Sequence, residues 1–568
     1  MQISWKQEIK SVQQITNEEI LKLILKNRKI KNINEFLNPS FIDKIHIGNF
    51  GDGFKNEVKT TIQLLKKIRK NNETVVVYTD YDADGITGGA ILWETLHLLG
   101  FKAIPYVPHR KNEGYGFSVK GIDNVKNEFN PALIISVDHG ITAKEKVTYA
   151  KKLGIPIIIT DHHLKPEQIP DDAKAIFHIT ALSGSGVAYF FSKMIFEEFK
   201  FSQPGNIQAQ LSENFESYYL ALASIGTIAD LVPLVGPSRS IVYHGLKEFE
   251  HTKRVGLQCI LENAGITGKP ITTYEIGYII APRINAVGRL EHAINALRLL
   301  CTKDKAKASG LASHLGLKNR ERQDLVEKSV KQALLRLEAS EGKPNKIPKL
   351  IILYDPDWNE GIIGLIASKM SEKYYRPVII LTKSDGILKG SARSVGEFHI
   401  TNFLRELKKY LIDIGGHQGA AGFTIEEKKL TEFNTAALGL INKHLEDKDL
   451  ERKIEADIKI PLSKITLALA KTIEKLQPFG IGNPQPKFYC EGKIIDAKLM
   501  GKNNQHLKIY IKDDASFPLE ILSFNNGKEF INLSKGKKIE VVISLSVNRW
   551  NSKEQLQGIL INSICINK

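Results

Sequence analysis

Cysteine and long apolar runs are scarce in this sequence. The four cysteines among 568 residues are far apart and include no CxxC pair (Cys259, Cys301, Cys490 and Cys565). This spacing argues against a disulfide framework and against a zinc site built on thiolates. No apolar run approaches the roughly 18 to 20 residues that cross a bilayer, and the first residues lack the apolar core of a signal peptide. We therefore expect a cytoplasmic protein without a membrane segment.

Length and charge are the next constraints. A chain of 568 residues is too long for one hydrophobic core and should divide into about three or four domains. The net charge is +16, from 79 Lys and Arg against 63 Asp and Glu. This excess suits a polyanionic partner such as nucleic acid, although a lysine-rich surface also keeps proteins soluble. Charge alone leaves both interpretations open.

The order of apolar patterns divides the chain into five parts. Strand-like and helix-like segments alternate in two separate regions, as is typical of α/β domains. A long-helix composition lies between them, and five β-branched runs near the C-terminus fit an oligonucleotide-binding barrel. We predict two α/β lobes joined by a long helix plus a C-terminal OB-fold β-barrel. The predicted parts are an N-terminal helical segment (1–55), a first α/β domain (56–240), a helical connector (241–345), a second α/β domain (346–445) and the barrel (451–568).

Acidic residues follow three apolar runs of the first α/β domain. The runs 74-TVVVYT-79, 132-ALIISV-137 and 155-IPIIIT-160 are rich in β-branched residues and do not alternate with polar ones, as expected of strands buried on both faces. Each run is followed at once by an aspartate. Because ligands gather beyond the carboxyl ends of parallel strands, these acids should converge in one crevice. The candidate residues of this crevice are Asp80, Asp82, Asp84, Asp138, Asp161, His162, His163 and Asp230.

So many carboxylates in one crevice repel one another unless cations neutralise them. Oxygen ligands with one or two imidazoles and no sulfur suit Mn²⁺ or Mg²⁺. The alternative is that DxDxDG caps a helix or binds one calcium ion, but an EF-hand loop starting at Asp80 would place Ile91 where its glutamate belongs. Two neighbouring divalent cations favour phosphoester hydrolysis as the reaction class.

Nine short motifs in a fixed order define a resemblance. Four of them, in the first α/β domain, are 80-DYDADGIT-87, 136-SVDHGIT-142, 160-TDHH-163 and 226-GTIADLVPL-234. Together they resemble the catalytic lobe of the DHH phosphoesterase family, and 415-GGHQGAAGF-423 is similar to the DHHA1 signature that accompanies it. Four further motifs resemble one family within this group, the RecJ single-strand-specific DNA exonucleases. They are 281-APRINAVGRL-290, 390-GSARS-394, 478-PFGIGNPQP-486 and 548-NRW-550.

The resemblance implies roles for individual residues. Two Mn²⁺ or Mg²⁺ ions would be held, one by Asp80, Asp82 and Asp138, the other by Asp84, Asp138, His162 and Asp230. Asp161 and His163 would orient the site, and His417 would contact the scissile phosphate. The sequence departs from the family pattern at two places. It has 358-WNEG-361 in place of WHxG, which puts any role of Asn359 in doubt. The segment at 175–186 is short and lacks the Asn-Pro element.

An exonuclease must also hold a strand end and the strand behind it. Arginine forks with hydroxyl donors suit a terminal phosphate, although a structural ion pair is as good an explanation for any single arginine. By resemblance, Arg110, Ser391 and Arg393 would line a 5′-phosphate pocket. Glycines at 415, 416, 419 and 422 would let backbone amides approach phosphate. Aromatic side chains of the barrel could stack on bases, and the candidates are Phe488, Tyr489, Tyr510 and chiefly Trp550. Most of these rings could equally be barrel core. The further substrate-binding candidates are Tyr115, Arg283, Asn285 and Arg289.

The resemblance implies a 5′ to 3′ exonuclease that degrades single-stranded DNA to 5′-mononucleotides in DNA recombination and repair. We expect a monomer that works with a single-strand-binding protein and a helicase. One alternative is a DHH phosphodiesterase of short oligonucleotides, which would not need the barrel. The other is a catalytically silent single-strand-binding relative, which would be expected to lack metal ligands that are all present here.

Overall fold

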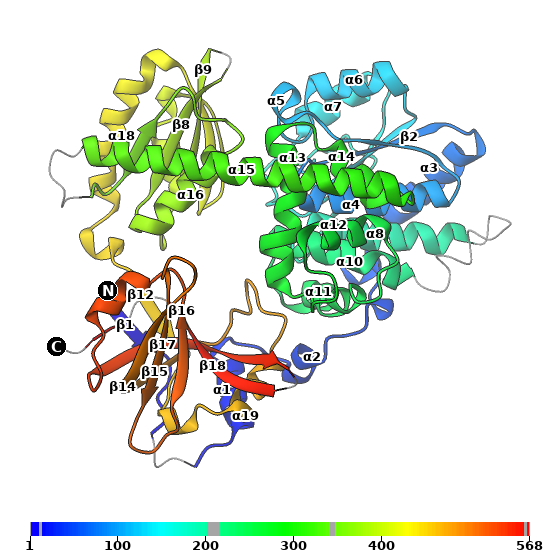
Figure 1. Ribbon diagram of the computed structural model, residues 1–568. Helices are drawn as coiled ribbons and strands as arrows, with labels where there is room; N and C mark the ends of the chain where they lie inside the picture. Colours follow the sequence, from blue (N-terminus) through cyan, green and yellow to red (C-terminus); the bar gives the residue numbers. More distant parts are fainter. Residues whose placement is uncertain are drawn as a thin grey trace. The chain divides into compact units, whose positions relative to one another are not determined.

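The computed structural model describes residues 2–10, 14–200, 215–340, 347–384, 386–551, 553–561 and 565–566 (Figure 1). The chain forms two compact units. The larger contains Ile3–Leu315 together with Ile454–Lys568, and the smaller contains Gly316–Lys453 with the first two residues. None of the described helices combines the length and the apolar character needed to cross a membrane.

A parallel five-stranded sheet forms the centre of the larger unit. Its order is β3-β2-β4-β5-β6, so the chain leaves β2 on one side and returns on the other. The carboxyl ends of β2 and β4 therefore flank a topological switch point, where open α/β sheets bind ligands. The strands are β2 (Thr74–Thr79), β3 (Lys102–Tyr106), β4 (Leu133–Val137), β5 (Ile157–Asp161) and β6 (Ala175–His178).

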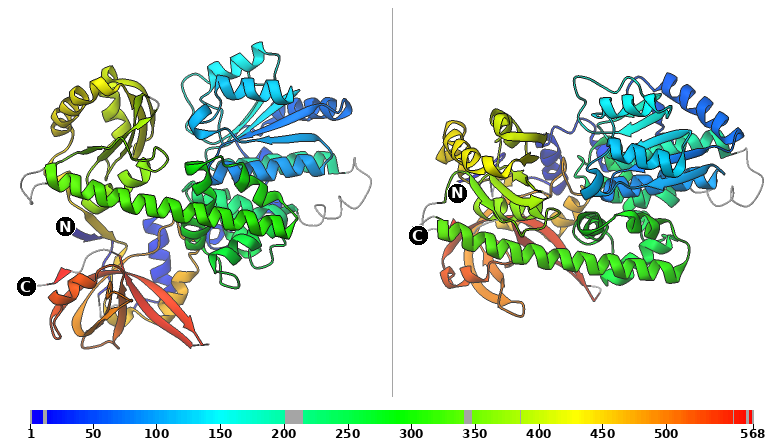
Figure 2. Two further views of the ribbon diagram at one scale, coloured as in Figure 1. Left: turned by 45° about the horizontal axis from the view of Figure 1, so that its top comes forward. Right: turned by 90° about the horizontal axis from the view of Figure 1, so that it is seen from above.

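Helices cover both faces of this sheet, as the unbroken apolar runs predict (Figure 2). In β2, Val75 and Val77 face one core, while Val76 and Tyr78 face the other. Every residue of β2, β4 and β5 is buried. The helices of this region are α3 (Lys55–Lys70), α4 (Ala83–Leu98), α5 (Arg110–Glu113), α6 (Val119–Phe129), α7 (Lys144–Lys152), α8 (Gly184–Phe199), α10 (Phe215–Ala229), α11 (Gly236–Glu248), α12 (Val255–Ala264), the π-helix η4 (Glu275–Ile280), α13 (Ala281–Leu290) and α14 (Ile294–Cys301).

The C-terminal strands form the predicted barrel. Strand β14 pairs with both β15 and β17, and β16 and β18 complete the circuit. The five predicted strand runs fall on β14 to β19. The elements are β12 (Lys453–Ala456), β13 (Ile458–Lys459), η8 (Leu462–Lys464), α19 (Leu467–Glu474), β14 (Phe488–Met500), β15 (His506–Lys512), β16 (Leu519–Ser523), η9 (Gly527–Asn532), β17 (Lys538–Trp550), β18 (Lys553–Leu560) and β19 (Cys565–Ile566).

The N-terminal segment packs against the C-terminal barrel. It begins with a strand, and the apolar face of its first helix, which includes Ile20 and Ile24, joins the barrel core at Ile458 and Leu469. The predicted helical segment at 1–55 did not include this packing, because the partners are more than 400 residues apart in the sequence. Its elements are β1 (Gln2–Trp5), α1 (Asn17–Asn27), α2 (Ile33–Leu37), η1 (Ile42–Lys44) and η2 (Ile47–Asn49).

The smaller unit is the second α/β domain. Its sheet has the order β10-β11-β9-β8-β7, and all pairs are antiparallel except β7–β8. The long helix α15 (Lys305–Ser340) is continuous over 36 residues and carries the chain from one unit to the other, as predicted. The other elements are β7 (Ile351–Tyr354), α16 (Ile363–Tyr374), β8 (Val378–Ser384), β9 (Ile387–Arg393), α17 (Ile400–Glu406), η5 (Lys408–Tyr410), β10 (Leu411–Gly416), β11 (Ala420–Ile425), η6 (Glu427–Lys429), α18 (Leu430–His444) and η7 (Asp447–Leu450).

Candidate metal centre

The loop between β2 and α4 brings three aspartates to the switch point. Asp80 donates its backbone N–H to Val137 at 3.2 Å, which ties the loop to the end of β4. Asp82 is the N-cap of α4, and its Oδ1 accepts the N–H groups of Asp84 and Gly85 at 2.9 and 3.0 Å. A Cβ on Gly85 would lie 2.7 Å from Asp80 Cβ. Only glycine allows the loop to turn this tightly.

The carboxylate of Asp84 is held by the start of α8. Its Oδ2 accepts from Gly184 N at 2.6 Å, and its Oδ1 accepts from Ser185 N at 2.9 Å. A Cβ on Gly226 would lie 2.2 Å from Asp84 Oδ1. The sequence reasoning missed these supports, and treated 175–186 only as a departure from a pattern. Glycine and serine at a helix start, an arrangement that commonly binds anions, were the available signal.

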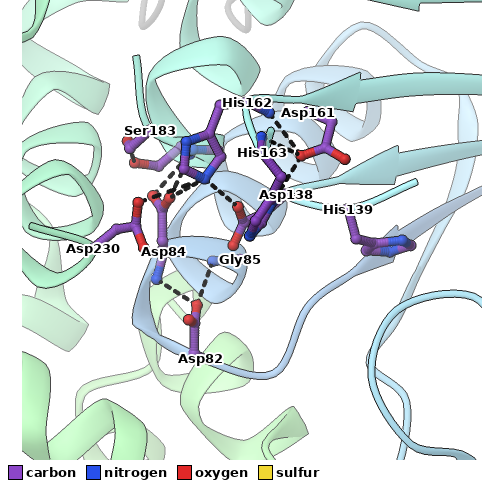
Figure 3. A network of polar contacts seen from close by, with 12 residues as sticks. Asp82, Asp84, Gly85, Asp138, His139, Asp161, His162, His163, Ser183 and Asp230 are labelled. Carbon is purple, nitrogen blue, oxygen red and sulfur yellow. Dashed lines mark hydrogen bonds and ion pairs between the residues drawn. The ribbon is translucent and has the colours of Figure 1, made fainter. Parts of the chain in front are cut away.

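Residues of three other elements complete the cluster (Figure 3). His162 Nε2 lies 3.1 Å from Asp138 Oδ1, 3.5 Å from Asp230 Oδ2 and 4.0 Å from Asp84 Oδ2. Asp138 follows β4 with a φ of +68°, a left-handed conformation that aspartate tolerates better than most residues. Asp230 follows α10. The strand-end aspartates therefore converge as the sequence predicts.

A second polar network lies beside the cluster. Asp161 Oδ1 accepts the N–H groups of His162 and His163 and contacts His163 Nδ1 at 2.8 Å. Burial would raise the pKa of Asp161, but the hydrogen bond and charge of His163 lower it. Burial would lower the pKa of His163, but the hydrogen bond and charge of Asp161 raise it to about 9. In the metal-free fold this contact favours protonated His163, whose Nε2 lies 3.1 Å from the Tyr115 hydroxyl.

Burial and mutual repulsion dominate the remaining titrations. The pKa values of Asp80 and Asp138 are raised well above their usual range, first by burial and then by neighbouring aspartates. The same causes raise the pKa of Asp230 to about 8, whereas burial lowers that of His162. His139 points away from the cluster in Figure 3, and burial lowers its pKa to about 4. Without cations, the cluster must hold protons at neutral pH.

Buried ligand atoms that make no hydrogen bond fit this cluster to divalent cations. Among the described residues, Asp80 Oδ1, Asp138 Oδ1 and His162 Nε2 are buried and make no hydrogen bond. Such atoms cost free energy unless an ion or water satisfies them. Three sets of ligand atoms within 4.8 Å of one another are Asp80, Asp82 and Asp138; Asp84, His162 and Asp230; and Asp138, His162 and His163. Their oxygen and imidazole donors suit Mn²⁺ or Mg²⁺.

Helix α13 supports the aspartate loop from outside. Asn285 Oδ1 accepts the N–H of Ala83 at 2.8 Å, and a Cβ on Gly288 would lie 2.6 Å from the Tyr81 carbonyl oxygen. Asn285, a substrate-binding candidate by sequence, is thus placed against the loop. Arg283 donates to the Ile279 carbonyl at 2.7 Å. On the other side, the Arg110 guanidinium lies 5.1 Å from the Tyr81 ring centre.

Comparison with known proteins agrees with this geometry. Three family models match the chain: the DHH family N-terminal domain over residues 74–227, the DHHA1 domain over 348–443 and the RecJ OB domain over 456–562. The single-stranded-DNA-specific exonuclease RecJ of Haemophilus influenzae is 30% identical over 97% of both chains. The chain belongs to the RecJ family.

Other RecJ proteins extend the comparison. RecJ of Bacillus subtilis is 33% identical over 90% of this chain, which spans 64% of that relative's length. The crystal structure of Thermus thermophilus RecJ in complex with Mn²⁺ has a TM-score of 0.79 and 27% identity, covering 100% of this chain and 80% of that one. The Mg²⁺ complex of that protein gives a TM-score of 0.73 and 26% identity over 99% and 78%. The predicted lobes and barrel are thereby confirmed.

The smaller unit carries the motif 390-GSARS-394 and the DHHA1 signature 415-GGHQGAAGF-423. Arg393 donates to Ser368 Oγ at 3.0 Å and to Ser391 Oγ at 3.3 Å, and burial lowers its pKa. A Cβ on Gly364 would lie 3.0 Å from Arg393 and 3.2 Å from Ser391 Oγ, so both side chains gather at the start of α16. His417 is exposed in the turn between β10 and β11. Gly416 is needed there for its φ of +147°, whereas positions 415, 419 and 422 have open space.

The barrel aromatics divide into core and surface. Phe488 and Tyr489 are buried, and Tyr510 is half-buried with its hydroxyl donating to Glu520 at 2.8 Å. Trp550 is 73% exposed at the end of β17 and pairs with Lys553. Only Trp550 of these four presents an open ring for stacking. The substitution of WHxG by WNEG leaves Trp358 buried and Asn359 Oδ1 accepting from Gly361 N at 2.8 Å.

Proposed function

We propose that this protein is a metal-dependent exonuclease that degrades single-stranded DNA from a 5′ end and releases 5′-mononucleotides. The observation that carries this proposal is the convergence of Asp80, Asp138 and His162, whose buried ligand atoms make no hydrogen bond. Membership of the RecJ family supports the substrate class.

The ligand sets support two cation positions. Asp80, Asp82 and Asp138 would hold one ion, and Asp84, His162 and Asp230 the other, with Asp138 between them because its Oδ1 also contacts His162. Two bound Mn²⁺ or Mg²⁺ ions would supply an activated water and would neutralise charge on the attacking and leaving oxygens.

The protein's own groups would position the phosphodiester. The contact between Asp161 and His163 favours a positive charge on His163 at the edge of the cluster. Such preorganised charge stabilises negative charge as it develops, because no reorganisation is needed during the reaction. Asn285 fixes the loop that carries Asp82 and Asp84.

The strand end requires a separate subsite. In the smaller unit, Ser391 and Arg393 gather beside the start of α16, where backbone N–H groups favour an anion. We assign the terminal 5′-phosphate to Ser391 and Arg393. Arginine suits the role because its guanidinium donates two parallel hydrogen bonds to phosphate. Trp550 would stack on the strand farther away.

The test is cleavage of labelled strands by the purified protein with Mn²⁺. Single-stranded DNA labelled at its 5′ end should release labelled mononucleotide first, while blunt duplex and RNA of the same sequence should persist. Long labelled products would contradict attack at the 5′ end. Cleavage confined to strands of a few nucleotides would favour the short-oligonucleotide phosphodiesterase, and binding without cleavage would favour the silent relative.

We further propose a cytoplasmic monomer that acts in DNA recombination and repair beside a single-strand-binding protein and a helicase. Light scattering of the purified protein tests the monomer: a molar mass near 63.6 kDa is expected, and twice that mass would contradict it. Pull-down with each purified partner protein tests the associations.

A further inference from the structure

Two exposed tyrosines stack on each other at the start of the helix that supports the aspartate loop. Tyr274 is 59% exposed and Tyr278 is 71% exposed. Their ring centres lie 4.9 Å apart with an interplanar angle of 30°. An i,i+4 aromatic pair stabilises a helix by only about 0.2–0.5 kcal/mol. Helix stability is therefore a small reason to keep two large rings in water.

The backbone at this pair is unusual. Residues Glu275–Ile280 form a π-helix, an element that is rare in proteins and often lies at functional sites. It continues directly into α13, whose Asn285 accepts from Ala83 N and whose Gly288 lies against Tyr81. The tyrosine pair and the aspartate loop are thus joined by one rigid element. The seven residues from Tyr278 to Asn285 span about 10 Å along a helix.

A hollow of about 570 Å³ opens beside the pair. Tyr274 lines it together with Lys247, Pro270, Phe479, Gln485 and Ser546. Its volume is in the range of sites that enclose small organic groups. Ser546 belongs to β17, which ends four residues later at the exposed Trp550. Aromatic and polar groups therefore continue from the pair toward the barrel surface.

We propose that Tyr274 and Tyr278 form a base-stacking subsite for single-stranded DNA, which holds nucleobases a few positions behind the terminal nucleotide. The subsite deepens the proposed exonuclease function and depends on it. A span of about 10 Å corresponds to about three nucleotides at the stacked spacing of about 3.4 Å. Every base has a flat apolar face, so stacking on tyrosine holds a strand without regard to sequence.

Charge favours a nucleic acid over an apolar protein segment as the occupant. The chain carries a net charge of +16, and Lys247 lies within the hollow, 4.1 Å from the Tyr243 ring. Glu250 is the one carboxylate among the residues that line this hollow, and it is exposed. A backbone of phosphates with stacked bases complements such a surface better than a neutral peptide does.

The subsite is tested by DNA binding with divalent metal removed by chelation, so that strands stay intact. Fluorescence anisotropy would follow the affinity for a single strand of about 16 nucleotides or more. One abasic position is moved stepwise from the 5′ end. Wild-type protein should lose about tenfold in affinity when the missing base reaches the pair, as expected for one lost stacking contact. The double variant Tyr274→Ala with Tyr278→Ala should lose about tenfold on the intact strand and nothing further on that abasic strand.

Matched variants separate stacking from folding. Tyr274→Phe with Tyr278→Phe keeps both rings and should bind as wild type does. Phe41→Ala removes a ring of similar exposure (60%) elsewhere in the larger unit and should leave affinity unchanged. With Mn²⁺ restored, the double alanine variant should hydrolyse a dinucleotide at the wild-type rate, because so short a strand does not reach the pair.

The outcomes distinguish the two proposals. If wild-type protein neither binds nor degrades single strands, the exonuclease function itself is wrong. If wild-type protein does both and the double alanine variant matches it on intact and abasic strands, the stacking subsite is wrong and the exposed rings face a protein partner instead. A melting temperature equal to that of wild type confirms that the alanine variant is folded.

Discussion

The metal centre buries polar atoms, whereas the exposed aromatic residues leave apolar rings in water. At the metal centre, Asp80 and Asp138 are 2% and 3% exposed, and each has a buried carboxylate oxygen that makes no hydrogen bond. At Tyr278 and Trp550, large rings are 71% and 73% exposed. Burying an ionised carboxylate costs several kcal/mol, whereas covering a large apolar side chain returns about 1.5–3 kcal/mol. The first region therefore requires its ligand far more strongly than the second.

The two regions also differ in how rigidly they are built. Each aspartate of the centre is fixed by backbone hydrogen bonds or by a glycine that allows close contact, as at Asp84 with Gly184 and Gly226. The backbone of Trp550 is held at the end of β17 by its pairing with Lys553. Small changes at the centre should have large catalytic effects, and removal of a whole ring should have a small one.

Asp138→Ala should abolish cleavage while single-strand binding persists. Asp138 is a ligand of one proposed cation position, and its Oδ1 lies 3.1 Å from His162 of the other, so its loss affects both. Metal ions contribute several kcal/mol to transition-state stabilisation, so the rate should fall by about 10³-fold or more. Turnover of labelled DNA measures the loss of rate, and calorimetric titration with Mn²⁺ measures the loss of metal binding. Asp123→Ala, which removes a carboxylate hydrogen-bonded to Tyr149, is the control and should cleave normally. Activity that survived Asp138→Ala would refute the two-metal assignment.

Gly226→Ala should impair catalysis although Gly226 has no side chain to contact substrate. Its Cβ would lie 2.1 Å from Ser185 Oγ and 2.2 Å from Asp84 Oδ1, so the carboxylate must move. A displacement of about 1 Å costs about 10²-fold in rate. The melting temperature should also fall, because overpacking costs about 1–3 kcal/mol.

Gly310→Ala is the matched control for that substitution. Gly310 lies in α15 with nothing within 4 Å of its would-be Cβ. Alanine there should raise the free energy of unfolding by about 0.5–1 kcal/mol and leave the rate unchanged. Equal cleavage rates in Gly226→Ala and Gly310→Ala would mean that close packing around Asp84 has no effect on catalysis.

The metal-free protein should lose stability relative to the metal-bound protein as pH rises. Asp230 has a pKa of about 8 in the fold, against an ordinary value of 3.8. The folded state therefore binds this proton more tightly than the unfolded state does, and the associated stability is lost as pH rises from about 4 through about 8. Cations replace the proton, so the gain in melting temperature on adding Mn²⁺ should grow between about pH 5 and pH 9. Scanning calorimetry measures this gain, and Asp230→Asn should flatten its pH dependence. A gain that is constant with pH would contradict the prediction.

The sequence predicted the acid cluster because one local rule repeats there. An apolar run followed by aspartate occurs at Asp80, Asp138 and Asp161, and parallel strands bring such ends together. The supports of Asp84 were not predictable in this way, because Gly184 lies 100 residues along the chain and contributes a backbone N–H, which no residue letter reveals.

The fold shows the same division between local and distant information. The parallel sheet, the long helix α15 and the barrel follow from local periodicity, and all are present. The packing of α1 on the barrel depends on contacts between distant segments and was missed. Aromatic residues of the barrel were equally ambiguous, because Phe488 in the core and Trp550 on the surface both occur in strand patterns. Only the closed barrel decides which ring faces outward.

Trp550→Ala should have the smallest effect of the series and should separate binding from folding. One base–aromatic stack contributes about 1–3 kcal/mol, so affinity for single-stranded DNA should fall by roughly tenfold. The free energy of unfolding should stay within about 0.5 kcal/mol of wild type, since the ring is exposed. Phe488→Ala, in the core of the same barrel, should instead cost about 3–5 kcal/mol of stability.

Urea unfolding measures the stability of each variant, and fluorescence anisotropy measures its affinity for single-stranded DNA. Trp550→Phe should restore most of the affinity, because an aromatic face is retained. A stability loss in Trp550→Ala as large as that in Phe488→Ala would place the ring in the core and remove the contrast between the two regions.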